Sequence, residues 1–366
     1  MVGSPSRGTI ANYLNDVAAT STSSAWAVGS WYDTSRAAPR TLALRWNGAQ
    51  WSTVATPNAT GYYNELTAVD STASNDVWAV GYANGSSGVN GAPRNNLVLH
   101  YNGTSWSVVT TPQPGVQTRE LYDVEALAAR NAWAVGWYYD TGFVAESLVL
   151  HWNGTSWLKT DVPNPGDGIN QLYGVGASSP TDVWAVGTTT NTGDPRGNRH
   201  PLALHYNGTA WSTVPMPDTA SGSALLRSVT AISPTDAWAV GSQSGYSQPV
   251  AYHWNGTAWT LVSTPAVGSP GNNLFYRVTA LDSGRVWAVG YTSGSASGPQ
   301  PLVERWNGSS WSVEPTPTQP LGGAAQGVAA ITGSAGTATV WVSGYRTAFV
   351  NGGYTDRTLT LRGTGG

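Results

Sequence analysis

The chain of 366 residues contains no cysteine. This absence excludes disulfide bonds, thiolate metal ligands and cysteine nucleophiles. Charged residues make up only 10% of the chain, and the formal net charge is −3. So weak a charge offers no electrostatic basis for binding nucleic acid or an anionic membrane surface. No run approaches the roughly 20 consecutive apolar residues that span a bilayer, so we expect no membrane insertion.

Lysine and phenylalanine are also scarce. Of the 17 basic residues, 16 are arginine, a bias that we interpret as that of a GC-rich bacterial genome. Glycine (44), proline (22), tryptophan (19) and tyrosine (17) are instead abundant. This composition is typical of many short strands joined by tight turns, and it holds enough apolar surface to exclude a disordered chain.

A repeat of about 52 residues runs through the whole chain. The string W-A-V-G begins at Trp26, Trp78, Trp133, Trp184, Trp238 and Trp287, and a degenerate copy begins at Trp341. In six copies a second string follows, in which His or Arg precedes an aromatic residue and N-G-x-x-W. It spans residues 45–51, 100–106, 151–157, 205–211, 253–259 and 305–311.

Each repeat has the pattern of four strands. In the fifth copy, residues 226–232, 237–241, 249–254 and 259–262 alternate with turn residues. Asn255-Gly256 marks a hairpin, and we expect both residues of such a turn to have positive φ. Seven such units with no helical period predict an all-β fold, a seven-bladed β-propeller that forms one domain over residues 1–366.

The last blade lacks a fourth strand of its own, because the chain ends four residues after Arg362. At the other end, Val2-Gly3-Ser4-Pro5 matches the V-x-T-P that finishes the fourth strands. We therefore predict that the N-terminal segment completes the last blade and closes the ring.

The hairpin Trp152-Asn153-Gly154-Thr155-Ser156-Trp157 resembles the Asp-box, S-x-D-x-G-x-x-W, of sialidase-type (BNR-like) propellers. The whole unit, with Asp182-Val183-Trp184-Ala185-Val186-Gly187 upstream, is similar to the repeats of photosystem II assembly-factor-like propellers. Asn replaces the Asp of the box in this chain. The resemblance implies the architecture and transfers no catalytic residue, since the arginine triad and the Tyr/Glu pair of sialidases match no motif in the sequence.

Residues that recur in every blade are interpreted as scaffold. His100, His151, His205 and His253 share one repeat position, at which other blades have Arg, so we expect them to bond a neighbouring strand. Trp31 and Trp137 are the two tryptophans outside the repeat positions. Both enter the loop between the second and third strands, which opens on the face around one mouth of the central channel, the usual ligand site of such a fold.

Arginine gathers in the same loops, at Arg36, Arg40, Arg94, Arg196, Arg199, Arg346 and Arg357, and His200 is the one histidine outside the repeat position. The entries to the innermost strands add tyrosines, amides and carboxylates. Aromatic rings stack on sugar faces and polar groups bond hydroxyls, so we predict a ligand-binding face. Its candidate residues are Trp31, Tyr32, Tyr62, Tyr63, Asn64, Arg119, Glu120, Tyr122, Trp137, Tyr138, Tyr139, Tyr173, Arg199, His200, Arg227, Tyr276 and Arg277.

The favoured function is binding of a glycan or other small polar ligand by a lectin-like, secreted or cell-surface monomer, with no cofactor and no metal. The sequence shows no signal-peptide pattern, and Met1-Val2 stands where a strand would begin, as after removal of a leader. Two alternatives stay open. A polysaccharide lyase on the same face would draw on His200, Tyr173, Arg199 and Arg227. A glycosidase there would instead need a carboxylate pair, for which the sequence offers Asp33, Glu65, Glu120, Asp123, Asp140, Glu146 and Asp194 without selecting any. A protein-interaction scaffold would bind a protein partner on that face. Whether the chain is an enzyme is therefore undecided.

Overall fold

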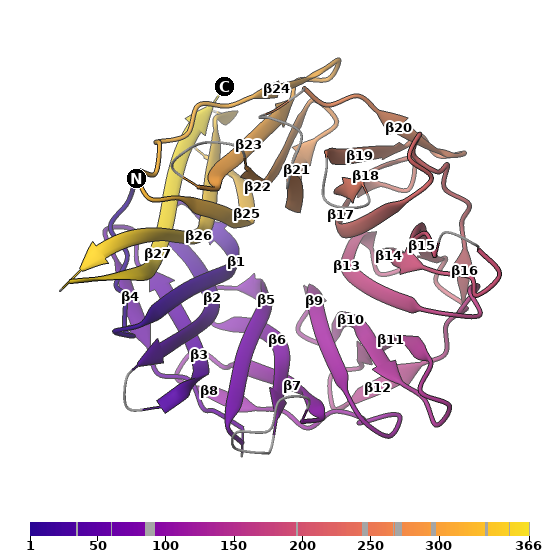
Figure 1. Ribbon diagram of the computed structural model, residues 1–366, viewed down its shortest axis with the longest axis horizontal. Coiled ribbons are helices and arrows are strands. Elements are labelled where there is room, and N and C mark those ends of the chain that lie inside the picture. The colour runs from indigo at the N-terminus through magenta and orange to yellow at the C-terminus, as the bar shows by residue number, and fades with distance from the viewer. Residues whose placement is uncertain are drawn as a thin grey trace.

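The computed structural model describes residues 1–366 except 34–35, 60, 85–91, 195–196, 244–247, 266, 268–272, 294–297, 334–335, 351 and 366. Seven antiparallel sheets are arranged around a central axis, as Figure 1 shows. Each sheet follows chain order, from an innermost strand at the axis to an outer strand at the rim. The prediction of a seven-bladed all-β propeller is confirmed.

Among the described residues, six blades have four strands each and blade 7 has three. Blade 1 consists of β1 (Ala11–Ser21), β2 (Ser24–Asp33), β3 (Arg36–Trp46) and β4 (Trp51–Val54). Blade 2 consists of β5 (Tyr63–Ala73), β6 (Asp76–Asn84), β7 (Arg94–Tyr101) and β8 (Trp106–Val108). Blade 3 consists of β9 (Arg119–Ala128), β10 (Asn131–Tyr139), β11 (Ala145–Trp152) and β12 (Trp157–Thr160). Blade 4 consists of β13 (Asn170–Ser179), β14 (Asp182–Thr189), β15 (His200–Tyr206) and β16 (Trp211–Thr213). Blade 5 consists of β17 (Ala224–Ser233), β18 (Asp236–Gln243), β19 (Pro249–Trp254) and β20 (Trp259–Val262). Blade 6 consists of β21 (Leu274–Asp282), β22 (Arg285–Thr292), β23 (Gln300–Trp306) and β24 (Trp311–Val313). Blade 7 consists of β25 (Gly323–Thr332), β26 (Ala338–Val350) and β27 (Gly353–Gly365).

The hydrophobic core consists of layers between neighbouring blades. Trp26 and Val28 of β2, for example, pack with Leu66 and Val69 of β5 in one buried cluster. Strands alternate their side chains between two faces, and each face of a blade meets another blade, so both faces are apolar. This explains why W-A-V-G is buried at almost every position.

In each Asn-Gly turn, the two residues have different roles. Gly48 and its five equivalents have φ between 89° and 96°, a region that favours glycine. Asn47 does not have a positive φ; its Oδ1 accepts hydrogen bonds from the backbone N–H groups of Ala49 (3.0 Å) and Gln50 (2.9 Å). The expectation of a left-handed Asn is therefore wrong, because the Asn side chain organises the turn instead.

The repeat histidines belong to the scaffold, as predicted. His100 Nε2 lies 2.6 Å from Asp76 Oδ1 at the preceding hairpin, and its ring stacks on Trp78 with the ring centres 4.2 Å apart. His205 makes the same pair of contacts, with Asp182 and Trp184. These histidines join the third strand to the turn before the second.

The N-terminal segment closes the ring against blade 7, near both chain ends in Figure 1. Val2 N donates to Thr360 O at 2.9 Å, and Ser4 Oγ donates to Thr358 Oγ1 at 2.9 Å. The predicted closure is thus confirmed, with one correction. The segment forms a single bridge at Val2 and no full fourth strand, so blade 7 is a three-stranded sheet.

Deleting residues 1–8 should lower the melting temperature by several degrees, because the deletion removes the bridge at Thr360 and the hydrogen bonds to Thr358. Circular dichroism melting curves measure this change. Thr358→Val removes only the hydroxyl contacts and should cost less. If the deletion melts like the intact chain, the ring is not fastened by this segment.

Candidate ligand-binding site at the channel mouth

Every innermost strand contains a β-bulge, which turns the side chain of one residue toward the channel. The register shifts at the same repeat position in each blade, for example between Leu14 and Asp16 in β1 and between Leu226 and Ser228 in β17. The residues at this position line one cavity of about 170 Å³ at one end of the channel: Asn15, Thr67, Tyr122, Tyr173, Arg227, Tyr276 and Gln326. Glu65, Tyr82 and Arg277 complete its wall.

Tyrosines and carboxylates form a network between blades 2 and 3. Tyr63 and Tyr82 stack, with ring centres 5.8 Å apart, and both donate hydrogen bonds to Glu65 Oε2 at 2.7 and 3.1 Å. In blade 3, Glu120 accepts hydrogen bonds from Tyr122 and from Arg94, whose guanidinium also lies over the Tyr82 ring. The network holds this side of the cavity wall in place.

Tyr122 and Tyr173 remain protonated at neutral pH. Burial is the main cause that raises the pKa of Tyr122, and the nearby Glu120 raises it further. Burial likewise raises the pKa of Tyr173, although Arg199 and Arg227 act in the opposite direction. Both phenols are therefore hydrogen-bond donors rather than bases, and their rings meet edge-on at 4.9 Å.

Arg277 crosses the channel and forms the floor of the cavity. From β21 it reaches Asp123 Oδ2 with Nη1 at 2.8 Å, and its Nε lies 3.5 Å from Asp16 Oδ1. Its Nη2 donates to the carbonyl oxygens of Thr67 and Tyr122 at 3.3 and 3.2 Å. One side chain of blade 6 thus binds blades 1, 2 and 3.

A second cavity, of about 190 Å³, lies on the other side of Arg277 and is acidic. Asp16, Asp70 and Asp123 each accept a hydrogen bond from a backbone N–H of the next blade, at 2.7–3.0 Å. Burial raises the pKa of both Asp70 and Asp123 to about 7. In the described part of the chain, no group of three or more His, Asp or Glu is arranged to hold a metal ion.

The structure brings together five of the predicted residues in the cavity wall: Tyr122, Tyr173, Arg227, Tyr276 and Arg277. Three more predicted residues lie outside the cavity and are joined to its wall by hydrogen bonds. These are Tyr63 through Glu65, Glu120 through Tyr122, and Arg199, whose Nη1 donates to Gln171 Oε1 at 3.4 Å beside Tyr173.

Trp31 and Trp137 are buried, with 6% and 9% of their surfaces exposed. The guanidinium carbons of Arg7 and Arg40 lie 4.8 and 5.3 Å from the centre of the Trp31 ring. Trp137 packs edge-on against Tyr139 at 5.2 Å. Neither indole presents an open face on which a sugar could stack.

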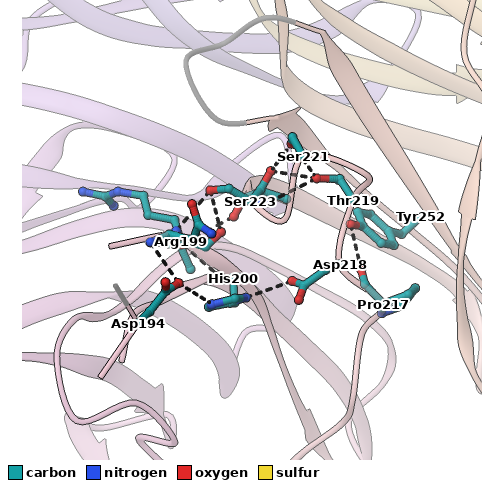
Figure 2. A network of polar contacts seen from close by, with 12 residues as sticks. Asp194, Arg199, His200, Pro217, Asp218, Thr219, Ser221, Ser223 and Tyr252 are labelled. Carbon is teal, nitrogen blue, oxygen red and sulfur yellow. Dashed lines mark hydrogen bonds and ion pairs between the residues drawn. The ribbon is translucent and has the colours of Figure 1, made fainter. Parts of the chain in front are cut away.

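His200 is held apart from the cavity wall. Its Nδ1 lies 2.9 Å from Asp218 Oδ1, and its Nε2 lies 3.4 Å from Asp194 Oδ2, as Figure 2 shows. The hydrogen bond to Asp218 is the main cause that raises the pKa of His200. His200 therefore joins two loops through Asp194 and Asp218 and does not line the cavity with Tyr173 and Arg227.

The other predicted residues lie around the same face. Asn64 is buried, Arg119 Nη2 donates to the Gln117 carbonyl at 2.7 Å, and the Lys159 ammonium lies over the Tyr138 ring at 5.8 Å. Half-buried positions are occupied by Tyr32, Tyr62 and Tyr139. Arg196 and the side chain of Arg36 lie outside the described residues.

Five cavity residues are absent from the predicted ligand-binding set: Asn15, Glu65, Thr67, Tyr82 and Gln326. Three of them occupy the bulge position, two residues before the recurring Val of the innermost strands, as in Leu14-Asn15-Asp16-Val17. Alignment of the seven strands on this pattern would have found them. Tyr82 lies on a second strand and had no such signal.

No protein-family model matches the chain, and no curated protein sequence matches it. Solved structures share its fold. YCF48 bound to D1 peptide is 14% identical, with a TM-score of 0.53 over 93% of this chain and 91% of that chain. YCF48 from Cyanidioschyzon merolae is 16% identical, with a TM-score of 0.54 over 92% and 94%. An ulvan lyase of polysaccharide lyase family PL25 is 10% identical, with a TM-score of 0.55 over 98% of each chain.

At such low identities, the structural likeness establishes the fold alone. This chain is a seven-bladed propeller that shares its fold with the photosystem II assembly factor YCF48. No helix among the described residues has the length and apolar character needed to cross a membrane.

Proposed function

We propose that the protein binds a sugar residue of a glycan in the channel-mouth cavity. The observation that carries this proposal is the convergence of one side chain from each of the seven blades on a single cavity. Three of these seven are tyrosines, two are amides, and one is an arginine. Sugar-binding sites combine such flat rings with hydrogen-bonding groups.

The size and polarity of the cavity favour one small polar ring. Its volume of about 170 Å³ is below the roughly 300–1,000 Å³ of sites for drug-sized ligands. Gln326 Oε1 is buried without a hydrogen-bond partner among the described residues, and it can accept a bond from a ligand hydroxyl. Tyr122 and Tyr173 donate their hydroxyl protons to Glu120 and Gln171, so their oxygens offer further acceptors to ligand hydroxyls.

A glycan array followed by isothermal titration calorimetry tests the proposal. Gln326→Leu and Tyr173→Ala should each weaken binding by about tenfold or more, because each removes a hydrogen-bonding group or a ring surface from the cavity. Tyr354→Ala is the matched control, since Tyr354 is 73% exposed and does not line the cavity. Equal binding by all three variants would reject this site.

A lyase remains the alternative within the same cavity. The ulvan lyase with this fold is described bound to a uronate-containing disaccharide, and Tyr173 and Arg227 both line the cavity of this chain. The raised pKa of Tyr173 and the separate position of His200 favour binding over proton abstraction. Incubation with uronate polysaccharides, followed by ultraviolet absorbance of the unsaturated product, separates the two functions.

A protein partner is the other alternative, since YCF48 is described bound to a peptide. A pull-down that recovers one protein in high salt, together with a negative glycan array, would favour it. Secretion and a monomeric state remain predictions, which cell fractionation and light scattering can test.

A further inference from the structure

Tyrosine side chains continue beyond the cavity wall at the junction of blades 7 and 1, where β26 lies beside β1 (Figure 1). Tyr13 of β1 meets Tyr345 of β26 edge-on, with the ring centres 5.2 Å apart. Tyr13 also meets Tyr32 of β2 edge-on, at 6.1 Å. All three side chains are partly exposed. They form a second aromatic surface, which we call the outer tyrosine surface.

Strand register places this surface at repeat positions that line the cavity in blade 2. Tyr345 follows the glycine of its motif in β26, as Tyr82 does in β6. Tyr13 lies two residues before the bulge residue of β1, as Glu65 does in β5. Both Tyr82 and Glu65 line the cavity. Asn15, the bulge residue of β1, lines it too, so Tyr13 lies about 7 Å along the strand from the cavity wall.

A carboxylate accompanies these tyrosines, as Glu65 does in blade 2. Asp356 Oδ2 accepts a hydrogen bond from Tyr13 at 2.7 Å, and Asp356 Oδ1 accepts one from Thr347 at 2.8 Å. Each carboxylate oxygen has a second lone pair, so Asp356 can also accept a bond from a ligand hydroxyl. Burial raises the pKa of Tyr345, and no described residue accepts its hydroxyl proton, so this side chain can donate to a ligand.

The outer tyrosine surface lies on the side of the cavity where Gln326 supplies its buried acceptor oxygen. Gln326 belongs to β25 of blade 7, and Ala324, two residues before it, pairs with Tyr345. A sugar that donates to Gln326 in the cavity is therefore anchored next to the outer tyrosine surface.

We propose that the outer tyrosine surface binds the second sugar residue of a glycan chain whose first residue occupies the cavity. This inference rests on the proposed glycan-binding function, and it narrows the ligand from a single sugar to an oligosaccharide. The cavity has room for one small ring, so the next residue of a chain lies outside its wall. The outer tyrosine surface offers that residue flat rings, a carboxylate and a hydroxyl donor, the groups that bind sugars.

Isothermal titration calorimetry with single sugars and short chains tests the inference. The probes are the methyl glycosides of xylose, glucose, N-acetylglucosamine and galacturonic acid, and the linear disaccharides and trisaccharides of each. In the series that binds, the wild-type protein should bind the disaccharide about tenfold more tightly than the methyl glycoside, because the second residue adds ring contacts and hydrogen bonds. Equal affinity for the two overturns the inference and leaves the cavity site standing.

Variants of Tyr345 place the gain on the outer tyrosine surface. Tyr345→Ala should bind the methyl glycoside as the wild type does and should lose the tenfold gain. Tyr345→Phe keeps the ring packed on Tyr13, so it should melt like the wild type and lose about threefold of the gain through the missing hydroxyl. Tyr354→Ala, in the same β26–β27 hairpin, is the matched control and should keep the whole gain.

Gln326→Leu separates this inference from the function on which it rests. It should weaken binding of the methyl glycoside and of the disaccharide by the same factor, since it acts on the first residue alone. Binding of none of the probes overturns the glycan-binding function and this inference with it. A gain with chain length that survives in folded Tyr345→Ala overturns the inference alone, because the second residue then binds elsewhere.

Discussion

Replacing Arg277 with methionine should destabilise the propeller by about 3–5 kcal/mol, the range found when one partner of a buried ion pair is removed. The substitution leaves the Asp16 and Asp123 carboxylates buried and without their cation. It also removes the hydrogen bonds to the backbone of blades 2 and 3. Chemical denaturation measures the free energy of unfolding.

The loss should depend on pH. Burial raises the pKa of Asp123 to about 7 in the folded protein, although Arg277 lowers it, so removing Arg277 raises it further. Protonated carboxyls need no cation, and the loss should therefore shrink as the pH falls from 8 to 5. The double variant Arg277→Met/Asp123→Asn should recover part of the stability at pH 8. A pH-independent loss would mean that Arg277 acts by packing alone.

Replacing Glu304 with leucine should stabilise the protein by roughly 3 kcal/mol at pH 7. Glu304 is completely buried in β23, and both its carboxyl oxygens lack a hydrogen-bond partner among the described residues. Its repeat position holds Leu44, Leu99 and Leu150 in blades 1 to 3. Burial raises the pKa of Glu304 to about 8, so the folded protein holds this proton at neutral pH.

The sign of the pH dependence follows from that raised pKa. Between the ordinary pKa of a glutamate, about 4.3, and about 8, the folded state binds a proton that the unfolded state has released, so stability falls as the pH rises. Glu304→Leu should flatten this slope, and Glu304→Gln should flatten it without the added apolar contact. Leu150→Glu is the converse control and should introduce such a slope. If wild type and Glu304→Leu have parallel stability curves from pH 5 to 8.5, Glu304 is ionised in the fold.

The repeat positions were predictable because neighbouring blades present nearly the same surroundings to each copy. The Trp26 position, the Asn-Gly turns and the closure of blade 7 by Val2 all follow from comparing one unit with the next. The alternation of apolar and polar residues along a strand depends only on the local sequence. In a repeat protein each copy also packs against equivalent neighbouring copies, so one unit predicts which residues of the next are buried.

The ligand site was only partly predictable. Departure from the repeat identified Trp31 and Trp137, but such a departure does not decide exposure. Trp31 is buried because Arg7 and Arg40, from the N-terminal segment and β3, lie against its ring. Gln326 and Asn15, by contrast, have ordinary polar sequence contexts, and the bulge turns them into the cavity.

The sequence by itself determined the number of blades, the strand order within each blade and the residues that fill the layers between blades, because these depend on a period of about 52 residues. Only the tertiary structure decided which side chains meet across the channel. Arg277 contacts Tyr122 and Thr67, which lie 155 and 210 residues away in the chain. No local pattern encodes that contact, since ring closure brings the three strands to one axis and the side chains of each blade then meet those of the blades opposite.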